Sequence, residues 1–323
     1  MRNNALDAAK LLACFFIIVV HVGNYQEVSK PIGDFFRVSS RWALPFFFLS
    51  SGYLMGLSRN LDIEKKVNKL ISILFYSSIL YIPILYRNFN WDIERLAGKI
   101  ISNDTLHSGT FFHLWFINAL ILGVILTGYF IRNVSTWVSL TVSVLLILAC
   151  WSTDVIKSLH FELYYFYTFR TLIAFSLVYI GYILAVTKKL EGISIKTSSA
   201  LIVAGIALML AEVWVNNSLF NADIGERQFP LFCVPVSIFL LALSVNVKVR
   251  DNIISKLGRD YSLGVYLIHP FILYHLGHDV GGVVGNSSFL KLFVSFASAI
   301  VILYVLKKFI PIVYNKLNGV YVK

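Results

Sequence analysis

Charged residues are scarce in this 323-residue chain: they make up 14% of it, whereas 58% of the residues are hydrophobic. A soluble domain carries about 25% charged residues, so the composition excludes an ordinary soluble protein. The apolar runs are long and continuous, without the alternation of a membrane barrel. We therefore predict an all-α, polytopic membrane helix bundle that forms one membrane-embedded domain over residues 1–323.

Cysteine and the common ligand-binding motifs are also rare or missing. Cys14, Cys150 and Cys233 are odd in number, lie in apolar runs and lack metal-type spacing, so we interpret them as small buried hydrophobic residues. The sequence contains no P-loop, dinucleotide glycine motif, zinc motif or nucleophile elbow. This excludes ATP-driven machinery and predicts no metal, which leaves a membrane enzyme or a secondary transporter.

Ten apolar runs have the length of a membrane span. They cover residues 5–23, 38–58, 69–87, 112–131, 134–151, 168–187, 197–215, 228–247, 262–279 and 288–309. With the N-terminus inside, 17 of the 28 Lys and Arg residues lie on the cytoplasmic side and 8 on the other side. This bias predicts that both termini are cytoplasmic, and it explains the net charge of +11 without a nucleic-acid partner.

Ionisable residues inside the predicted spans are candidates for function, because they are costly in a membrane. Lys10 and His21 are eleven residues apart, about three helical turns, so both lie on one face of the first span. Asp7 lies one turn before Lys10 and is placed to pair with it or orient it. A lysine that reaches the headgroups and an interfacial histidine explain the Lys10–His21 pair equally well.

Other polar groups lie at defined depths in the predicted topology. We expect a polar track through the bundle, with imidazoles toward the outer side and cations toward the inner side. Its further members are Arg41, Ser50, Ser51, Gly52, His113, Arg170 and His269. Lys66 and Lys69 share a face at the start of the third span, where they could hold phosphates as point charges. Topology-setting lysines beside anionic lipid are the simpler explanation of that pair.

Four segments carry a family pattern. They read LDAAKLLACFFIIVVH, RWALPFFFLSSGYLMG, HLWFINALI and YSLGVYLIHPFIL, and they extend in this order from residue 6 to 273. Together they resemble the acyltransferase 3 family of bacterial multi-pass membrane proteins. The chain departs from the family in having Lys10 where arginine is commoner, which keeps the charge but loses the bidentate fork.

The resemblance implies a transferase. Family members move an acyl group, most often acetyl, from cytoplasmic acyl-CoA to a carbohydrate hydroxyl across the bacterial inner (plasma) membrane. It implies acetyl-CoA as cosubstrate, and membrane lipids and a lipid-linked or surface polysaccharide, such as lipopolysaccharide O-antigen, as partners. A secondary transporter or exporter of a small polar molecule or acyl group is the alternative.

Under this resemblance we predict site roles. His21 acts as general base or carries the acyl group, and Arg41 or His113 stabilises the oxyanion, as the backbone around Ser51 could also do. Lys66 and Lys69, with Lys10, hold the CoA phosphates. His269 acts as a second acid or base or makes a packing hydrogen bond, two roles that the sequence does not separate. The predicted catalytic set is His21, Lys10, Arg41 and His113; the donor set is Lys10, Lys66, Lys69 and Ser51; the supporting set is Asp7, His269, Arg170 and Trp115.

Overall fold

The computed structural model describes residues 3–25, 27–161, 164–280 and 282–320. Within these ranges the chain is helical and contains no strand, which agrees with the predicted all-α class. In chain order the elements are α1 (Asn4–His21), α2 (Lys30–Ser39), α3 (Ala43–Gly56), α4 (Ile63–Asn88), α5 (Ile93–Ile100), α6 (Asn103–Ser108), η1 (Phe112–Leu114), α7 (Trp115–Asn133), α8 (Thr136–Ser158), α9 (Tyr164–Val186), α10 (Ile195–Phe220), α11 (Cys233–Asn246), α12 (Ile253–His278), α13 (Gly282–Asn286), α14 (Ser288–Phe309) and α15 (Pro311–Leu317).

Each predicted span coincides mainly with one helix, namely α1, α3, α4, α7, α8, α9, α10, α11, α12 or α14; the span 38–58 also includes the end of α2, and the span 112–131 includes η1. Seven candidate spans in the described chain are long and apolar enough to cross a membrane, and they contain α1, α4, α7, α8, α9, α10 and α14. The helices α3 and α11 have 14 residues each, so they are about 21 Å long, short of a hydrocarbon core of about 30 Å. The multi-pass character is supported, and the count of ten spans stays a prediction.

Short polar residues fix where several helices begin. The side chain of Asn3 accepts a hydrogen bond from the Leu6 N–H at the start of α1. Asp62 caps α4 in the same way through the Lys65 N–H. Such caps satisfy N–H groups that have no partner inside the helix. Polar residues between apolar runs therefore set the helix boundaries.

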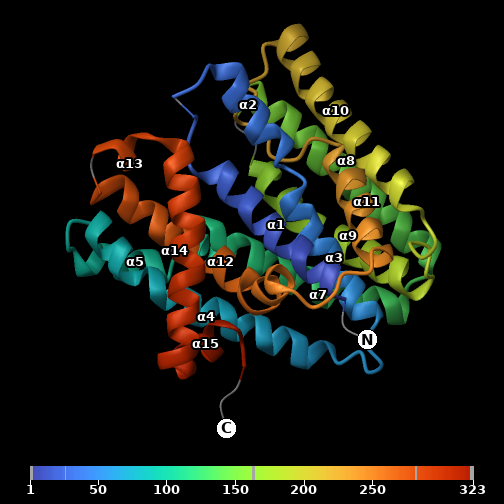
Figure 1. Cartoon of the computed structure of the whole chain (residues 1–323), viewed down its shortest axis with the longest axis horizontal. Coiled ribbons are helices and arrows are strands. Elements are labelled where there is room, and N and C mark those ends of the chain that lie inside the picture. The colour runs from blue at the N-terminus through green and yellow to red at the C-terminus, as the bar shows by residue number, and fades with distance from the viewer. Residues whose placement is uncertain (1–2, 26, 162–163, 281, 321–323) are drawn as a thin grey trace.

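Two helix pairs form the centre of the bundle, α1 with α12 and α3 with α9 (Figure 1). The α3–α9 pair is close enough to require glycine on both sides. A Cβ atom on Gly52 would lie 1.9 Å from the Val178 carbonyl oxygen, and one on Gly181 would lie 2.1 Å from the Leu49 carbonyl oxygen. Small residues at such crossings let helices pack closely inside a membrane.

The start of α1 and the last described helix, α15, both contact the region where α12 begins. The Asn4 side chain donates a hydrogen bond to the Val249 carbonyl at 3.1 Å, just before α12. The Tyr314 hydroxyl of α15 donates to the Asp260 carbonyl, early in α12, at 2.6 Å. An even number of crossings would bring the chain back to its starting side in this way. Which side of the membrane this end of the bundle faces stays a prediction.

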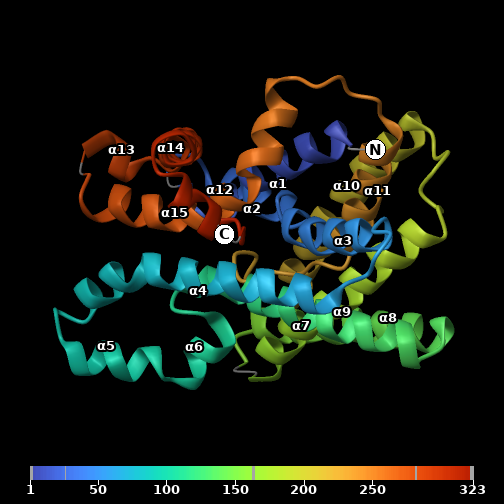
Figure 2. The same ribbon diagram turned by 90° about the horizontal axis from the view of Figure 1, so that it is seen from below.

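Figure 2 shows α5 and α6 beside α4, along one edge of the molecule.

Candidate functional site

Three histidines that are far apart in the sequence meet near the other end of the bundle. His21 is the last residue of α1, His113 lies in η1, and His269 lies in α12. The ring centroids of His21 and His269 are 5.5 Å apart, and those of His113 and His269 are 5.8 Å apart. The fold thus assembles an imidazole cluster from three of the four family-like segments.

A proline in α12 helps to fix this cluster. Pro270 has no N–H, so it cannot donate the helical hydrogen bond to the carbonyl of Tyr266, four residues earlier. The Nδ1 atom of His269 lies 2.8 Å from that carbonyl oxygen. His113 Nε2 lies 3.2 Å from the next carbonyl, that of Leu267, which also accepts a hydrogen bond from the Tyr81 hydroxyl at 2.6 Å. One nitrogen of each ring is therefore held against the backbone just before Pro270.

The second nitrogens of the same two rings have no hydrogen-bond partner among the described residues. These atoms are Nδ1 of His113 and Nε2 of His269. Both residues are buried, with exposed fractions of 2% and 0%, whereas His21 is exposed. Buried polar atoms are usually hydrogen-bonded, so an exception requires an explanation. A substrate or a proton in transit would supply the missing partner.

A cavity of about 90 Å³ lies beside the cluster. Four residues from the predicted site line it: His21, Arg41, His113 and Trp115. Arg41 donates through Nη2 to the Gly225 carbonyl at 3.3 Å, and its Nε atom has no partner among the described residues. The structure thus brings the predicted base and the predicted oxyanion ligands to one cavity.

Arg170 supports the wall of this cavity. Its guanidinium carbon lies 4.2 Å from the centre of the Trp115 ring and 4.9 Å from that of Tyr167. Its Nη1 atom is 3.5 Å from Oε1 of Gln228, another lining residue. A cation stacked on aromatic faces in this way stabilises the position of the rings.

Lys10 and Asp7 line a different cavity, at the end where α1 begins. Its volume is about 750 Å³. The Lys10 Nζ atom lies 3.8 Å from Oδ1 of Asp7. Two further cations line this cavity, Lys248 and Arg259. Both lie between the predicted spans 228–247 and 262–279, among the charges that set the topology, and only the packing of this segment against α1 places them beside Lys10.

Three predicted donor residues lie elsewhere in the described structure. Lys66 is half-buried and Lys69 is exposed on α4, and neither belongs to the described lining of the Lys10 cavity. Lys69 lies against the backbone at Gly319. The Ser51 hydroxyl donates to the Phe47 carbonyl of its own helix at 2.7 Å. The geometry therefore groups Lys10 with other cations than those expected.

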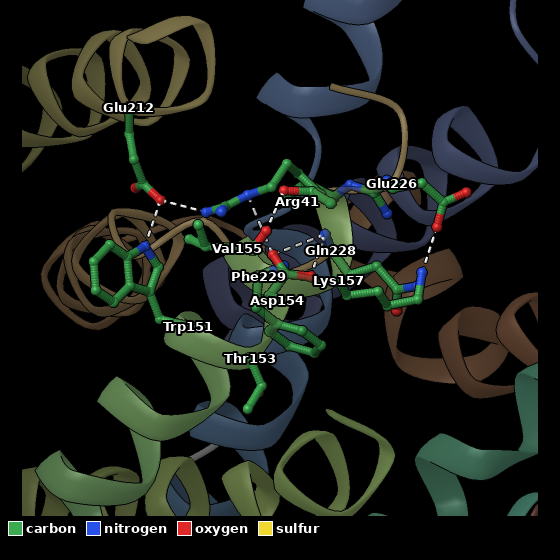
Figure 3. Close-up of polar contacts among 12 residues, drawn as sticks. Arg41, Trp151, Thr153, Asp154, Val155, Lys157, Glu212, Glu226, Gln228 and Phe229 are labelled. Atoms are coloured by element: carbon green, nitrogen blue, oxygen red, sulfur yellow. Dashed lines mark hydrogen bonds and ion pairs between the residues drawn. The ribbon is translucent and has the colours of Figure 1, made fainter. Parts of the chain in front are cut away.

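The structure also contains a buried ion cluster that the sequence analysis missed (Figure 3). Arg227 is fully buried, with Nε 3.3 Å from Oδ2 of Asp154 and Nη2 2.6 Å from Oε1 of Glu212. The same Glu212 oxygen accepts a hydrogen bond from the Trp151 indole at 2.7 Å. Glu212 lies inside the predicted span 197–215, so an intramembrane carboxylate was the signal that could have revealed the cluster.

This cluster anchors the segment between α10 and α11. Asp154 accepts hydrogen bonds from the backbone N–H groups of Gln228 and Phe229, both at 3.0 Å. Both residues line the histidine cavity. The buried charges thus hold one wall of the cavity in place (Figure 3).

The fold and the site define a multi-pass helical membrane protein with a polar cavity near each end of α1. Residues 3–308 match the Acyl_transf_3 family model, described as an acyltransferase domain. The chain therefore belongs to this acyltransferase family, as the four sequence segments predicted.

Curated relatives match most of the chain at low identity. An amino-acid racemase of Enterococcus faecalis is 24% identical over 297 residues, which cover 84% of this chain and 41% of the relative. A serine/alanine racemase of Enterococcus gallinarum is 22% identical over 294 residues, with the same two coverages. The chain thus spans about 41% of the length of these relatives, and their names describe those longer proteins. No solved structure matches.

Proposed function

We propose that the protein transfers an acyl group, with acetyl as the first choice, from cytoplasmic acyl-CoA to a hydroxyl of a cell-surface glycan such as O-antigen. The reaction would take place in the bacterial inner membrane. The observation that carries this proposal is the cavity shared by His21, Arg41 and His113 in a chain of the acyltransferase family. An imidazole beside a cation and a second imidazole suits acyl transfer to a hydroxyl.

In the proposed reaction His21 is the general base. It takes the proton of the acceptor hydroxyl while the hydroxyl oxygen attacks the thioester carbonyl. Arg41 and His113 stabilise the negative charge that develops on the carbonyl oxygen. When the carbon–sulfur bond breaks, the thiolate of CoA leaves and takes up the proton. In the covalent variant of the mechanism, a nitrogen of His21 attacks the thioester carbonyl and CoA leaves as the thiolate. The acceptor hydroxyl then attacks the acyl-imidazole, the acyl–nitrogen bond breaks, and the released imidazole takes up the hydroxyl proton.

The donor would enter at the end that carries Lys10. Lys10, Lys248 and Arg259 place three cations at a cavity of about 750 Å³, which suits the phosphates of CoA. From there the thin pantetheine arm would reach between the helices toward His21. Lys66 and Lys69, which lie outside the described lining of this cavity, stay in the proposal as further contacts to the CoA phosphates.

The test is mass spectrometry of surface glycans from cells that lack the gene and are complemented with wild type or His21→Ala. Wild type should add the mass of one acetyl group to a glycan repeat. His21→Ala should lower the transfer rate by about 10²–10⁴-fold, the contribution of a general base. Transfer near the wild-type level in a correctly inserted His21→Ala protein would refute the role of His21.

Controls separate the base from the donor site. His160→Ala changes a histidine outside the cluster, in the turn after α8, and should leave transfer unchanged. Lys10→Ala, assayed in membranes with acyl-CoA added, should raise the concentration of acyl-CoA needed for half-maximal transfer. An unchanged requirement would remove Lys10 from the donor site.

The second candidate is a secondary transporter of a small polar molecule. The observation that favours it is that the longer relatives are named amino-acid racemase and serine/alanine racemase, so those proteins act on amino acids. Uptake of labelled serine or alanine into protein-containing vesicles without acyl-CoA, together with an unchanged glycan profile, would favour transport over acyl transfer.

A further inference from the structure

A third cavity lies at the His21 end, outside the catalytic cavity. Its volume is about 440 Å³, within the range of about 300–1,000 Å³ that is usual for ligand sites. The lining comes from the segment after α1, from α2 and from the segment between α10 and α11. Its polar residues are Asn24, Lys30, Asp34, Arg37, Asp223 and Glu226.

Asp34 is the unusual residue of this cavity. It is only 7% exposed, yet its carboxylate makes no hydrogen bond or ion pair with the residues that the structure describes. Burial raises the pKa of Asp34 above its ordinary value. A buried carboxylate without a hydrogen-bond donor is costly, so a ligand that donates hydrogen bonds would satisfy it.

The neighbouring polar groups are already engaged. Arg37 donates to Oδ1 of Asn24 at 2.9 Å and to the Gly225 carbonyl at 3.2 Å. Asp223 accepts from the Gly225 N–H at 2.7 Å, and Glu226 pairs with Lys157, as Figure 3 shows. Asp34 is therefore the carboxylate of this lining that stays open to a ligand.

The charge of the lining indicates the class of ligand. The two cations Lys30 and Arg37 face three carboxylates, one of which is offset by Lys157. Such a balanced lining does not select a polyanion. A hydroxyl group both donates and accepts hydrogen bonds, so it can use the Asp34 carboxylate and the Lys30 ammonium group together.

The cavity shares a wall with the catalytic one. Arg37 and Arg41 are one helical turn apart in the sequence, and both donate to the carbonyl of Gly225. Arg37 lines the outer cavity and Arg41 lines the histidine cavity. A chain of sugar rings seated in the outer cavity would thus reach past these guanidinium groups toward His21.

We propose that the outer cavity binds a sugar unit of the acceptor glycan and that Asp34 accepts hydrogen bonds from its hydroxyl groups. This inference rests on the proposed acyltransferase function and names the acceptor subsite of that reaction. It makes Asp34 a residue for acceptor binding, while the bond-breaking chemistry stays at His21.

The test compares Asp34→Asn and Asp34→Ala with wild type in reconstituted membranes. Both variants should raise the KM for the acceptor glycan by about 10- to 100-fold, the effect of losing a hydrogen bond to a charged group. Hydrolysis of acyl-CoA without acceptor should not change. The unfolding temperature should stay constant or rise, because an unpaired buried charge is removed.

The matched control is Asp92→Asn, an aspartate that caps α5 away from the cavity. Asparagine caps helices as well as aspartate does, so this variant should keep wild-type kinetics and stability. An unchanged acceptor KM in both Asp34 variants would overturn the inference. A lower unfolding temperature with an unchanged acceptor KM would overturn it too, since Asp34 would then be structural.

A binding measurement separates this inference from the proposed function. If wild type acylates no glycan, the proposed function fails, and calorimetry with a soluble neutral oligosaccharide still tests the cavity. Binding to wild type that is lost in Asp34→Ala would support the subsite. Equal binding to both proteins, no binding to either, or binding of a quaternary ammonium compound instead of the sugar would overturn it.

Discussion

Two buried polar regions lie beside the same cavity and differ in how their charges are paired. Arg227 is held by two carboxylates, Asp154 and Glu212. In the histidine cluster, Nδ1 of His113 and Nε2 of His269 have no hydrogen-bond partner within the described chain. The ion cluster uses its charges to fix the backbone at Gln228. The imidazole nitrogens without a partner can bind a ligand. Without a ligand they do not contribute to the stability of the fold. Nη1 of Arg227 also has no hydrogen-bond partner among the described residues, so the ion pairs of Arg227, and not hydrogen bonding alone, distinguish the scaffold from the site.

The largest effect on stability is expected at the ion cluster. Arg227→Met removes the cation and leaves two carboxylates close together, so the free energy of unfolding should fall by about 3–5 kcal/mol. Denaturant unfolding in detergent measures this change. Arg227→Lys, which keeps the charge, should lose less. If Arg227→Met were as stable as wild type, the ion cluster would not be part of the scaffold, and the distinction between scaffold and site would be wrong.

A smaller loss of stability with a larger loss of activity is expected at His269. His269→Phe keeps the ring shape and loses the Nδ1 contact with the Tyr266 carbonyl, at a cost of about 1 kcal/mol. Acyl transfer should fall by about 100-fold if the open Nε2 atom takes part in proton transfer. Unfolding and transfer are measured on the same protein sample.

The matched control for His269→Phe lies on the same helix. His278 makes an equivalent contact through Nδ1 with the carbonyl four residues earlier, that of Tyr274, at 3.0 Å, but it is exposed. His278→Phe should leave acyl transfer unchanged. Equal losses of activity in the two variants would show that the helix, and not the cluster, is responsible.

The smallest effect is expected where charges pair at the surface. Hydrogen bonds from His275 and Arg87 lower the pKa of Asp279. A lowered carboxyl pKa stabilises the fold above the unfolded pKa of about 3.9, and this contribution is lost as the pH falls through the folded pKa. Asp279→Asn should thus be slightly less stable than wild type at pH 7, and the difference should vanish in acid. A loss as large as that of Arg227→Met would show that pairing alone, without burial, sets the effect.

Much of the fold could be predicted because the apolar runs are long. Each of the ten predicted ranges overlaps a helix, even in α12, where Pro270 interrupts the pattern. The lengths of α3 and α11 were overestimated, because the range 38–58 also takes in the end of α2 and the turn before α3, and the range 228–247 takes in the non-helical residues before α11. Hydropathy indicates whether a segment lies in an apolar environment. It does not show where the helix ends.

Part of the candidate site could be predicted as well. Of the predicted catalytic set, His21, Arg41 and His113 line one cavity, whereas Lys10 lines another. The ion cluster was missed because Arg227 was counted as a loop charge and Glu212 was overlooked inside a span. Lys66 and Lys69 were grouped with Lys10 by charge alone, whereas the described cavity groups Lys10 with Lys248 and Arg259.

The sequence by itself determined that this is a membrane protein, where its helices approximately lie and to which family it belongs. These properties depend on local composition and on short motifs, which a linear chain displays directly. Only the tertiary structure decided which polar groups meet, because contacts between distant segments depend on helix packing and on the path of the loops. It placed Arg227 between two carboxylates and left Asp34 buried without a hydrogen bond to the described residues, and neither outcome is encoded within any single segment.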